Sequence, residues 1–284
     1  MPLSTTLVGR ATAPQKHLVD ARWLMAYAAG LGETAACYFD TLQDLVAHPL
    51  FPVCIEWDPI LALRFGPGTE TMSPLEQARA VHADHDLHLL EPLRAGGSYT
   101  TVATAIGVEQ RAPGAYFLKR LDTRDAESRL VCRTYQGTLY RSVGIEGEAA
   151  SIDTAPAWPT TDAGAPSAHE LGVGAQAAHV YSECARIWNP IHTDRAHALA
   201  AGLPAIILHG TATLALAVSR LIDTHLGGDP TRVARLGARF SGLVFMPSTL
   251  RLIVTGADPQ TIAFEVLNPD GSAAIRRGFL GLRR

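Results

Sequence analysis

The stretch YSECARIWNPIHTD, which spans Tyr181–Asp194, decides the fold because an earlier part of the chain has the same outline. The earlier stretch, YAAGLGETAACYFD, spans Tyr27–Asp40 and lies 154 residues upstream; both begin with Tyr and end with Asp. Two further matches follow in the same order, LVAHPLFPVCIEW with LAAGLPAIILHG at an offset of 152, and LHLLEPLRAGGSYTTVATAIG with ARFSGLVFMPSTLRLIVTG at about 151. Three ordered matches at a nearly constant offset predict two equivalent halves.

Each half is predicted to contain a short helix, an irregular loop, a longer apolar helix and several strands. The short helices are expected over residues 19–31 and 179–187, and the apolar helix of the second half from Gly210 to about Asp223. Strands are recognised by alternating apolar and polar side chains. The expected strands cover residues 100–109, 115–121, 129–140, 232–240, 250–254, 261–267 and 274–282. This is an α+β plan in which each of two antiparallel sheets wraps around a central apolar helix.

The two halves are joined by a segment rich in Pro, Ala, Thr and Gly, as interdomain linkers often are. We therefore expect an N-terminal unit over residues 1–143, a linker over 144–167 and a C-terminal unit over 168–284. Units of this size lie in the usual range for domains. Hydrophobic residues make up 47% of the chain, so a substantial core can form.

Composition excludes several classes of function. A net charge of −3 and a pI of about 6.4 give no basic surface for general nucleic-acid binding. The four cysteines form no CxxC pair, so neither a zinc site nor a disulfide framework is expected, and a cytoplasmic location is the simplest interpretation. No run of about 18 apolar residues predicts a membrane span, and the N-terminus lacks an apolar signal core. His82, His85 and His88 are interpreted as surface or loop residues rather than metal ligands.

The most informative motif is Asn189-Pro-Ile-His192, followed by Leu203-Pro-Ala-Ile-Ile-Leu-His209-Gly210. It resembles the motif of MaoC-like (R)-specific enoyl-CoA hydratases and 3-hydroxyacyl-thioester dehydratases, which is G-D-x-N-P-[LI]-H and then, ~17 residues later, H-G. The resemblance covers nearly the whole second half, and the first half resembles the degenerate N-terminal copy of double hot-dog members. The resemblance therefore implies a tandem double hot-dog fold and a hydro-lyase.

The resemblance also implies residue roles. His192 would be the general base, the N–H of Gly210 at a helix N-terminus would bind the thioester oxygen, and Asn189 would hold the geometry of the site. His209 is either a supporting site residue or a packing residue before the helix. Coenzyme A or a phosphopantetheine arm would carry the acyl group of the substrate. Neither a dedicated cofactor nor a metal is expected.

The chain departs from the family motif in both halves. Ile187 stands where the family has its catalytic Asp, and Arg186 stands where it has Gly. Glu183, one helical turn earlier, is a candidate substitute acid, and Trp188 suits either the core or contact with an acyl chain. In the first half Glu33 fills the Asp position, and Ala35, Ala36 and Tyr38 replace Asn, Pro and His, so that half cannot hold the same catalytic group.

Three functions remain open on this basis. The first is a hydratase or dehydratase that adds or removes water at C2–C3 of an acyl thioester. The second is a thioesterase, and the third is a non-catalytic protein that binds an acyl thioester or another small ligand; the Ile at position 187 favours these two. Retention of Asn189, His192 and Gly210 favours the first. Expected partners are the small-molecule thioester and, as an open alternative, an acyl carrier protein; a monomer and a homodimer both remain open.

Overall fold

The computed structural model describes residues 2–66, 69 and 72–283. Its helices are α1 (Ala21–Gly30), α2 (Ala36–Phe39), α3 (Pro52–Arg64), α4 (Pro74–Ala78), α5 (Ala177–Ala185), α6 (Arg195–Ala200) and α7 (Gly210–His225), with 3-10 turns η1 (Thr5–Leu7), η2 (Pro190–His192) and η3 (Pro230–Arg232). Its strands are β1 (Leu3–Ser4), β2 (Gln15–Val19), β3 (Ala80–Leu89), β4 (Gly97–Arg111), β5 (Gly114–Arg124), β6 (Leu130–Arg141), β7 (Ile145–Glu146), β8 (Ala150–Ser151), β9 (Ser167–Val173), β10 (Val233–Phe240), β11 (Ser248–Ala257), β12 (Thr261–Leu267) and β13 (Ala273–Leu282).

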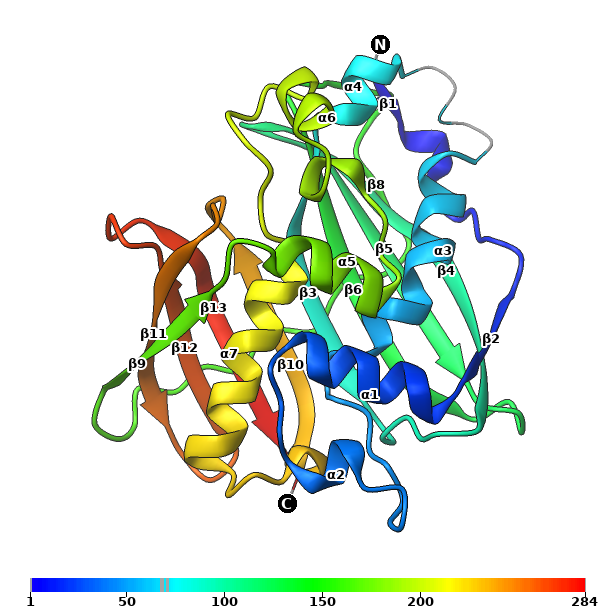
Figure 1. Ribbon diagram of the computed structural model, residues 1–284. Coiled ribbons are helices and arrows are strands. Elements are labelled where there is room, and N and C mark those ends of the chain that lie inside the picture. Colours follow the sequence, from blue (N-terminus) through cyan, green and yellow to red (C-terminus); the bar gives the residue numbers. More distant parts are fainter. Residues whose placement is uncertain (1, 67–68, 70–71, 284) are drawn as a thin grey trace.

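The main sheet runs through both halves of the chain. Its strand order is β2-β4-β5-β6-β3-β10-β13-β12-β11-β9, with β8 added on β4, and all of these neighbours are antiparallel. The halves meet where β3 pairs with β10, near the centre of Figure 1. The α+β plan is confirmed, and the two expected sheets join edge to edge into one. None of the helices in the described residues is both long and apolar enough to cross a membrane.

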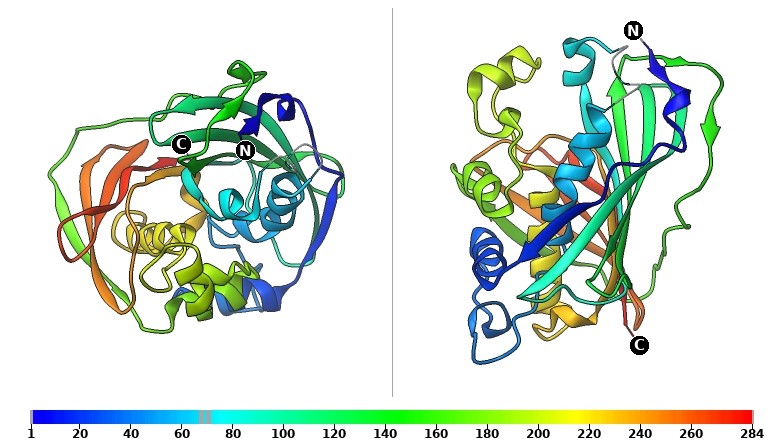
Figure 2. Two further views of the ribbon diagram at one scale, coloured as in Figure 1. Left: turned by 90° about the horizontal axis from the view of Figure 1, so that it is seen from above. Right: turned by 90° about the vertical axis from the view of Figure 1, so that its right-hand side faces the viewer.

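The sheet curves around two helices, one from each half. Figure 2 shows α3 and α7 on its concave side, with α1 and α5 covering the side that the sheet leaves open. The covering helices pack closely: a Cβ on Gly30 would come within 2.9 Å of the Cβ of Cys184, so only glycine fits there. The hydroxyls of Tyr27 and Tyr181 lie 3.3 Å apart. Both pairs are separated by the 154-residue offset of the repeat.

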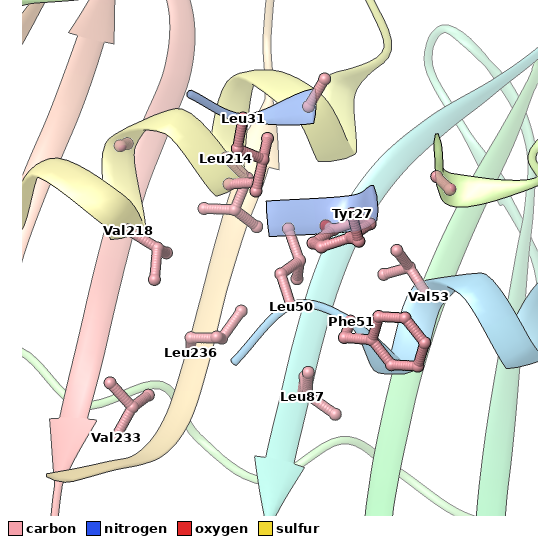
Figure 3. Close-up of a cluster of buried hydrophobic side chains, with 14 of the residues drawn as sticks. Tyr27, Leu31, Leu50, Phe51, Val53, Leu87, Leu214, Val218, Val233 and Leu236 are labelled. Carbon is pink, nitrogen blue, oxygen red and sulfur yellow. The ribbon is translucent and has the colours of Figure 1, made fainter. Parts of the chain in front are cut away.

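One hydrophobic core extends across both halves. In Figure 3, Leu214 and Val218 of α7 and Leu236 of β10 face a group from the first half that includes Tyr27 and Phe51. Because the buried side chains of the two halves pack into each other, neither half encloses this core by itself. The apolar face of α7 is almost completely buried, as expected for the central helix.

One sequence-based interpretation of the first half is wrong. His82, His85 and His88 do not lie in a surface loop but in β3, at the centre of the sheet. The sequence of this segment is polar for a central strand because it includes Asp84 and Asp86, whose side chains point to the outer face of the sheet. There Asp84 accepts from Arg239 Nε at 2.9 Å and Asp86 from Arg235 Nη2 at 2.7 Å, both on β10.

The segment over residues 144–167 follows the outer face of the sheet. It contributes β7 and β8, and its final residue, Ser167, already begins β9. Arg235 donates to the carbonyl oxygens of Pro156 and Ala157, and the ring of Trp158 lies 5.5 Å from that of Phe279. The segment is therefore attached to both the sheet and the ion pairs of its outer face.

Candidate active site

The loop that carries the motif starts from an unusual helix end. Arg186 ends α5 in the left-handed conformation, with φ of 57°, which usually favours glycine. Its guanidinium lies 3.9 Å from the centroid of the Trp23 ring of α1, so a cation–π contact offsets part of the backbone strain. The N–H of Ile187 then donates to the carbonyl of Ser182, and the chain turns into Asn189.

Asn189 and Pro190 set the position of His192. Asn189 is the N-cap residue of η2, and its side-chain oxygen accepts from the N–H of Ile191 at 3.5 Å, while Pro190 takes the first position of the turn. This turn directs the imidazole of His192 inward, where it is 9% exposed. Asn189 therefore shapes the turn and also lines the same cavity as His192.

A backbone carbonyl fixes the tautomer of His192. The Nδ1 atom of His192 lies 2.8 Å from the carbonyl oxygen of Ile207. Because a carbonyl only accepts, Nδ1 must carry the proton, and Nε2 is left with a lone pair. Burial lowers the pKa of His192 to about 4, against a smaller raising effect of the Ile207 carbonyl, so the ring is neutral near pH 7.

His209 supports His192 from one face. The two rings are stacked with centroids 3.6 Å apart and an interplanar angle of 23°. His209 Nε2 lies 3.2 Å from Ser182 Oγ, and burial holds the pKa of His209 well below its usual value. His209 is thus a buried, neutral packing partner of the candidate base.

Gly210 is the first residue of α7. The first N–H groups of a helix have no intrahelical partner, and the N-cap residue His209 provides no side-chain acceptor for them. A Cβ at position 210 would lie 3.0 Å from the Phe240 ring, so a larger residue there would displace that ring by a few tenths of an ångström. The start of α7 therefore presents N–H groups and the positive end of the helix dipole to the cavity.

The expected site residues converge on one cavity between the halves. It has a volume of about 190 Å³ and is lined by residues of both halves. The second half contributes Ile187, Asn189, His192, His209 and Gly210, and the first half contributes Glu56, His82, His85, Lys119, Gln136 and Thr138.

The substitute acid is not where it was expected. Glu183 is exposed and does not line the cavity, because it lies on the outer side of α5. Trp188 is 59% exposed, so it belongs neither to the core nor to the cavity wall. The Ile187 side chain is 6% exposed and lies both in the core and on the cavity wall. Among the described residues that line the cavity, Glu56 of α3 is the only carboxyl.

Comparisons with known proteins place both halves in dehydratase families. Residues 167–267 match the profile described as "MaoC like domain", and residues 6–127 match that described as "FAS1-like, dehydratase domain region". The second half of the chain therefore carries a MaoC-like domain, and most of the first half carries a dehydratase-like region.

Individual relatives agree with this assignment. A Mycobacterium tuberculosis protein named 3-hydroxyacyl-thioester dehydratase Y is 27% identical over 287 residues, which is 96% of this chain and 95% of that protein. Enoyl-CoA hydratase ChsH3 of the same organism is 27% identical over 208 residues, or 72% of this chain and 70% of that protein. The structure of a MaoC-like dehydratase from Phytophthora capsici superposes with a TM-score of 0.80 at 21% identity, covering 96% and 95% of the two chains. The tandem double hot-dog fold is confirmed.

Sequence reasoning missed the first-half wall of this MaoC-like site. His82 and His85 face the cavity, whereas His88 is on the outer face, 3.3 Å from Asp86. Glu56 and Lys119 stand in stretches that look like ordinary apolar helix and strand. One signal was available, because Lys119 is one of only two lysines in the chain and directly follows the apolar run Ala115–Leu118.

Proposed function

We propose that this protein adds water to, or removes it from, C2–C3 of an acyl thioester carried by coenzyme A or by a phosphopantetheine arm. The observation that carries the proposal is the pairing of His192, its Nδ1 fixed on the Ile207 carbonyl, with the N-terminus of α7 on one cavity. Similarity to proteins named as enoyl-CoA hydratases and 3-hydroxyacyl-thioester dehydratases supports it. The family resemblance further implies the R series of 3-hydroxyacyl products.

In the direction of hydration, His192 Nε2 takes a proton from water while the water oxygen bonds to C3. The electron pair of the C2–C3 double bond shifts toward the carbonyl, and the thioester oxygen becomes an enolate oxygen. The N–H of Gly210 and the dipole of α7 stabilise that negative charge. The imidazolium then returns its proton to C2, the carbonyl re-forms, and His192 is neutral again.

This scheme needs no carboxylate beside His192. Burial lowers the pKa of His192, and the Ile207 carbonyl raises it by a smaller amount. An imidazolium in such an apolar place is a strong acid, so it readily returns its proton to C2. The enolate charge beside it offsets part of the cost of forming it. Ile187 keeps this corner of the cavity apolar and favours the neutral ring before the reaction.

The decisive experiment is incubation with a series of trans-2-enoyl-CoAs, in which enoyl absorbance and released coenzyme A are followed separately. We expect loss of absorbance without release of coenzyme A, and the reverse reaction with (R)-3-hydroxyacyl-CoAs. Release of coenzyme A would instead identify a thioesterase.

A non-catalytic acyl-thioester binding protein is the second candidate. The apolar Ile187 at the family's Asp position favours it. It predicts saturable binding of acyl-CoAs by calorimetry with neither loss of enoyl absorbance nor release of coenzyme A. That result with every chain length would replace the hydro-lyase proposal.

A further inference from the structure

The first-half wall of the cavity carries a row of polar side chains across three neighbouring strands. Lys119 of β5 is paired with Gln136 of β6, and Gln136 is paired with His85 of β3. All three line the cavity together with Thr138 and His82. An unmodified hydrocarbon chain needs only apolar contacts, so this row needs a separate explanation.

Lys119 is a buried cation without a partner of opposite charge. Its side chain is 2% exposed, and Nζ donates to Thr138 Oγ1 at 2.6 Å. Within the described residues, no carboxylate lies at ion-pair distance from it. Burial, and secondly the nearby Arg64, lower the pKa of Lys119 to about 7. Two largely buried cationic side chains on one cavity oppose folding unless hydrogen bonds or a group of opposite charge compensate them.

Several polar atoms beside Lys119 are buried and have no protein partner. They are Nδ1 and Nε2 of His85, Nε2 of His82, Oε1 of Gln136 and Nε of Arg64. Buried polar atoms are nearly always bonded in folded proteins, so a cluster of unbonded ones on a single cavity indicates a binding site. All four of these side chains can donate hydrogen bonds, and none of them supplies a negative charge.

Glu56, the one acidic group that the described residues place on the cavity, is already engaged. Thr134 Oγ1 donates to Glu56 Oε1, and no ion pair joins Glu56 to Lys119 or Arg64 among the described residues. Burial raises the pKa of Glu56 to about 7, which weakens its repulsion of a second carboxylate at neutral pH. The remaining wall of α3 is apolar, through Val53, Trp57 and Ile60.

We propose that Lys119, with Arg64, His85 and Gln136, binds a carboxylate at the far end of a short acyl chain, so that the substrates are monothioesters of dicarboxylic acids. The inference rests on the proposed function, because the thioester end is placed at His192 and Gly210. A carboxylate would neutralise the buried cations and accept from the unpaired donors. The cavity of about 190 Å³ is smaller than the ~300–1,000 Å³ typical of drug-sized ligands, which favours a short chain.

The test compares chains that differ only at the far end. Binding of adipyl-CoA, hexanoyl-CoA and 6-hydroxyhexanoyl-CoA is measured by calorimetry, and hydration of trans-2-hexenedioyl-CoA is compared with that of trans-2-hexenoyl-CoA. The same comparison is repeated for chains of four to eight carbons. We expect the carboxylated chain to be preferred on the order of 10²-fold at the best length, as for a desolvated charge pair.

The variants are Lys119→Met, Lys119→Arg and, as a matched control, Met in place of Lys16, the other lysine, which is exposed on β2. Lys119→Met should abolish the preference and bind hexanoyl-CoA as well as or better than the natural protein, a gain that misfolding cannot produce. Lys119→Arg should keep part of the preference, and Lys16→Met all of it.

The outcomes separate this inference from the proposed function. Equal use of neutral and carboxylated chains at every length would overturn the carboxylate site while leaving the hydratase proposal intact. Preference for adipyl-CoA that depends on Lys119, without hydration of any chain, would support the site and defeat the hydratase proposal. An equal preference for the 6-hydroxyl chain, a preference unchanged in Lys119→Met, or no binding of any chain would also overturn the inference.

Discussion

The two halves share one plan but differ at the two points where the chemistry is proposed. At the end of the first short helix, Gly32 takes the left-handed conformation and Tyr38 stands where the second half has His192. The central helix of the first half begins with Pro52, which has no N–H, whereas that of the second begins with Gly210. At these two equivalent positions, the same scaffold therefore presents an imidazole and a helix-starting N–H in the second half but not in the first.

The difference continues inside the halves. The buried face of α7 carries apolar and threonine side chains, whereas α3 carries Glu56 and Arg64 toward the cavity. The first half thus lacks the His and Gly of the proposed site and carries the buried Glu56 and the partly buried Arg64 instead. Two copies of one fold can in this way have different roles, with proton transfer in one copy and recognition of the acyl chain in the other.

The largest effect is expected from removal of the candidate base. His192→Ala should lower kcat ~10²–10⁴-fold, because a positioned general base contributes about that much. The matched change in the other half, Tyr38→Phe, should leave kcat within ~3-fold, since the buried Tyr38 hydroxyl has no protein partner to lose. Steady-state hydration kinetics and thermal melts check both variants. Full activity in His192→Ala would remove the functional distinction between the halves.

Two substitutions at Gly210 test whether the N–H at the start of α7, which Pro52 lacks at the start of α3, takes part in the reaction. Gly210→Ala and Gly210→Pro both add a Cβ against Phe240, but only proline deletes the N–H. The backbone of His209, with ψ of 138°, is compatible with a following proline. We expect kcat of Gly210→Pro to be ~10²–10³-fold below that of Gly210→Ala, as for loss of an oxyanion donor. Equal rates in the two variants would exclude the Gly210 N–H from the reaction.

A smaller effect is expected from restoring the family's Asp. Ordinary short enoyl-CoAs should be poor substrates of the natural protein, and Ile187→Asp should raise their hydration ~10-fold or more by adding a carboxylate near a retained Asn189 and His192. The new buried carboxyl should also lower the melting temperature. Fast hydration by the natural protein that is lost in Ile187→Asp would instead mean that the site depends on its apolar corner.

The smallest effect concerns what the halves have in common. Tyr27→Phe and Tyr181→Phe each remove one hydroxyl of the same contact between α1 and α5. Each should lower the free energy of unfolding by ~0.5–1.5 kcal/mol, and the double variant by less than the sum of the two. Urea denaturation of the three variants measures this. Strictly additive losses would show that the two hydroxyls do not interact.

Much of this protein could be predicted from local sequence. The repeat offset is met again in the contacts Tyr27–Tyr181 and Gly30–Cys184, and strand β12 has the expected bounds. The Asn189 to His192 motif and the start of α7 at Gly210 were also located correctly, because turns, caps and helix starts depend on residues close together in the chain.

Only the tertiary structure decided what surrounds that motif. The histidines of β3 looked like surface or loop residues because the partners of the adjacent Asp84 and Asp86, Arg239 and Arg235, lie about 150 residues away on β10. An irregular register between His82 and Asp84 sets which side chains face the cavity. Lys119, on β5, becomes part of the cavity wall only because strand pairing places β5, β6 and β3 side by side. Local periodicity identifies a strand, whereas its neighbours, and hence the wall it forms, depend on long-range pairing and shared burial.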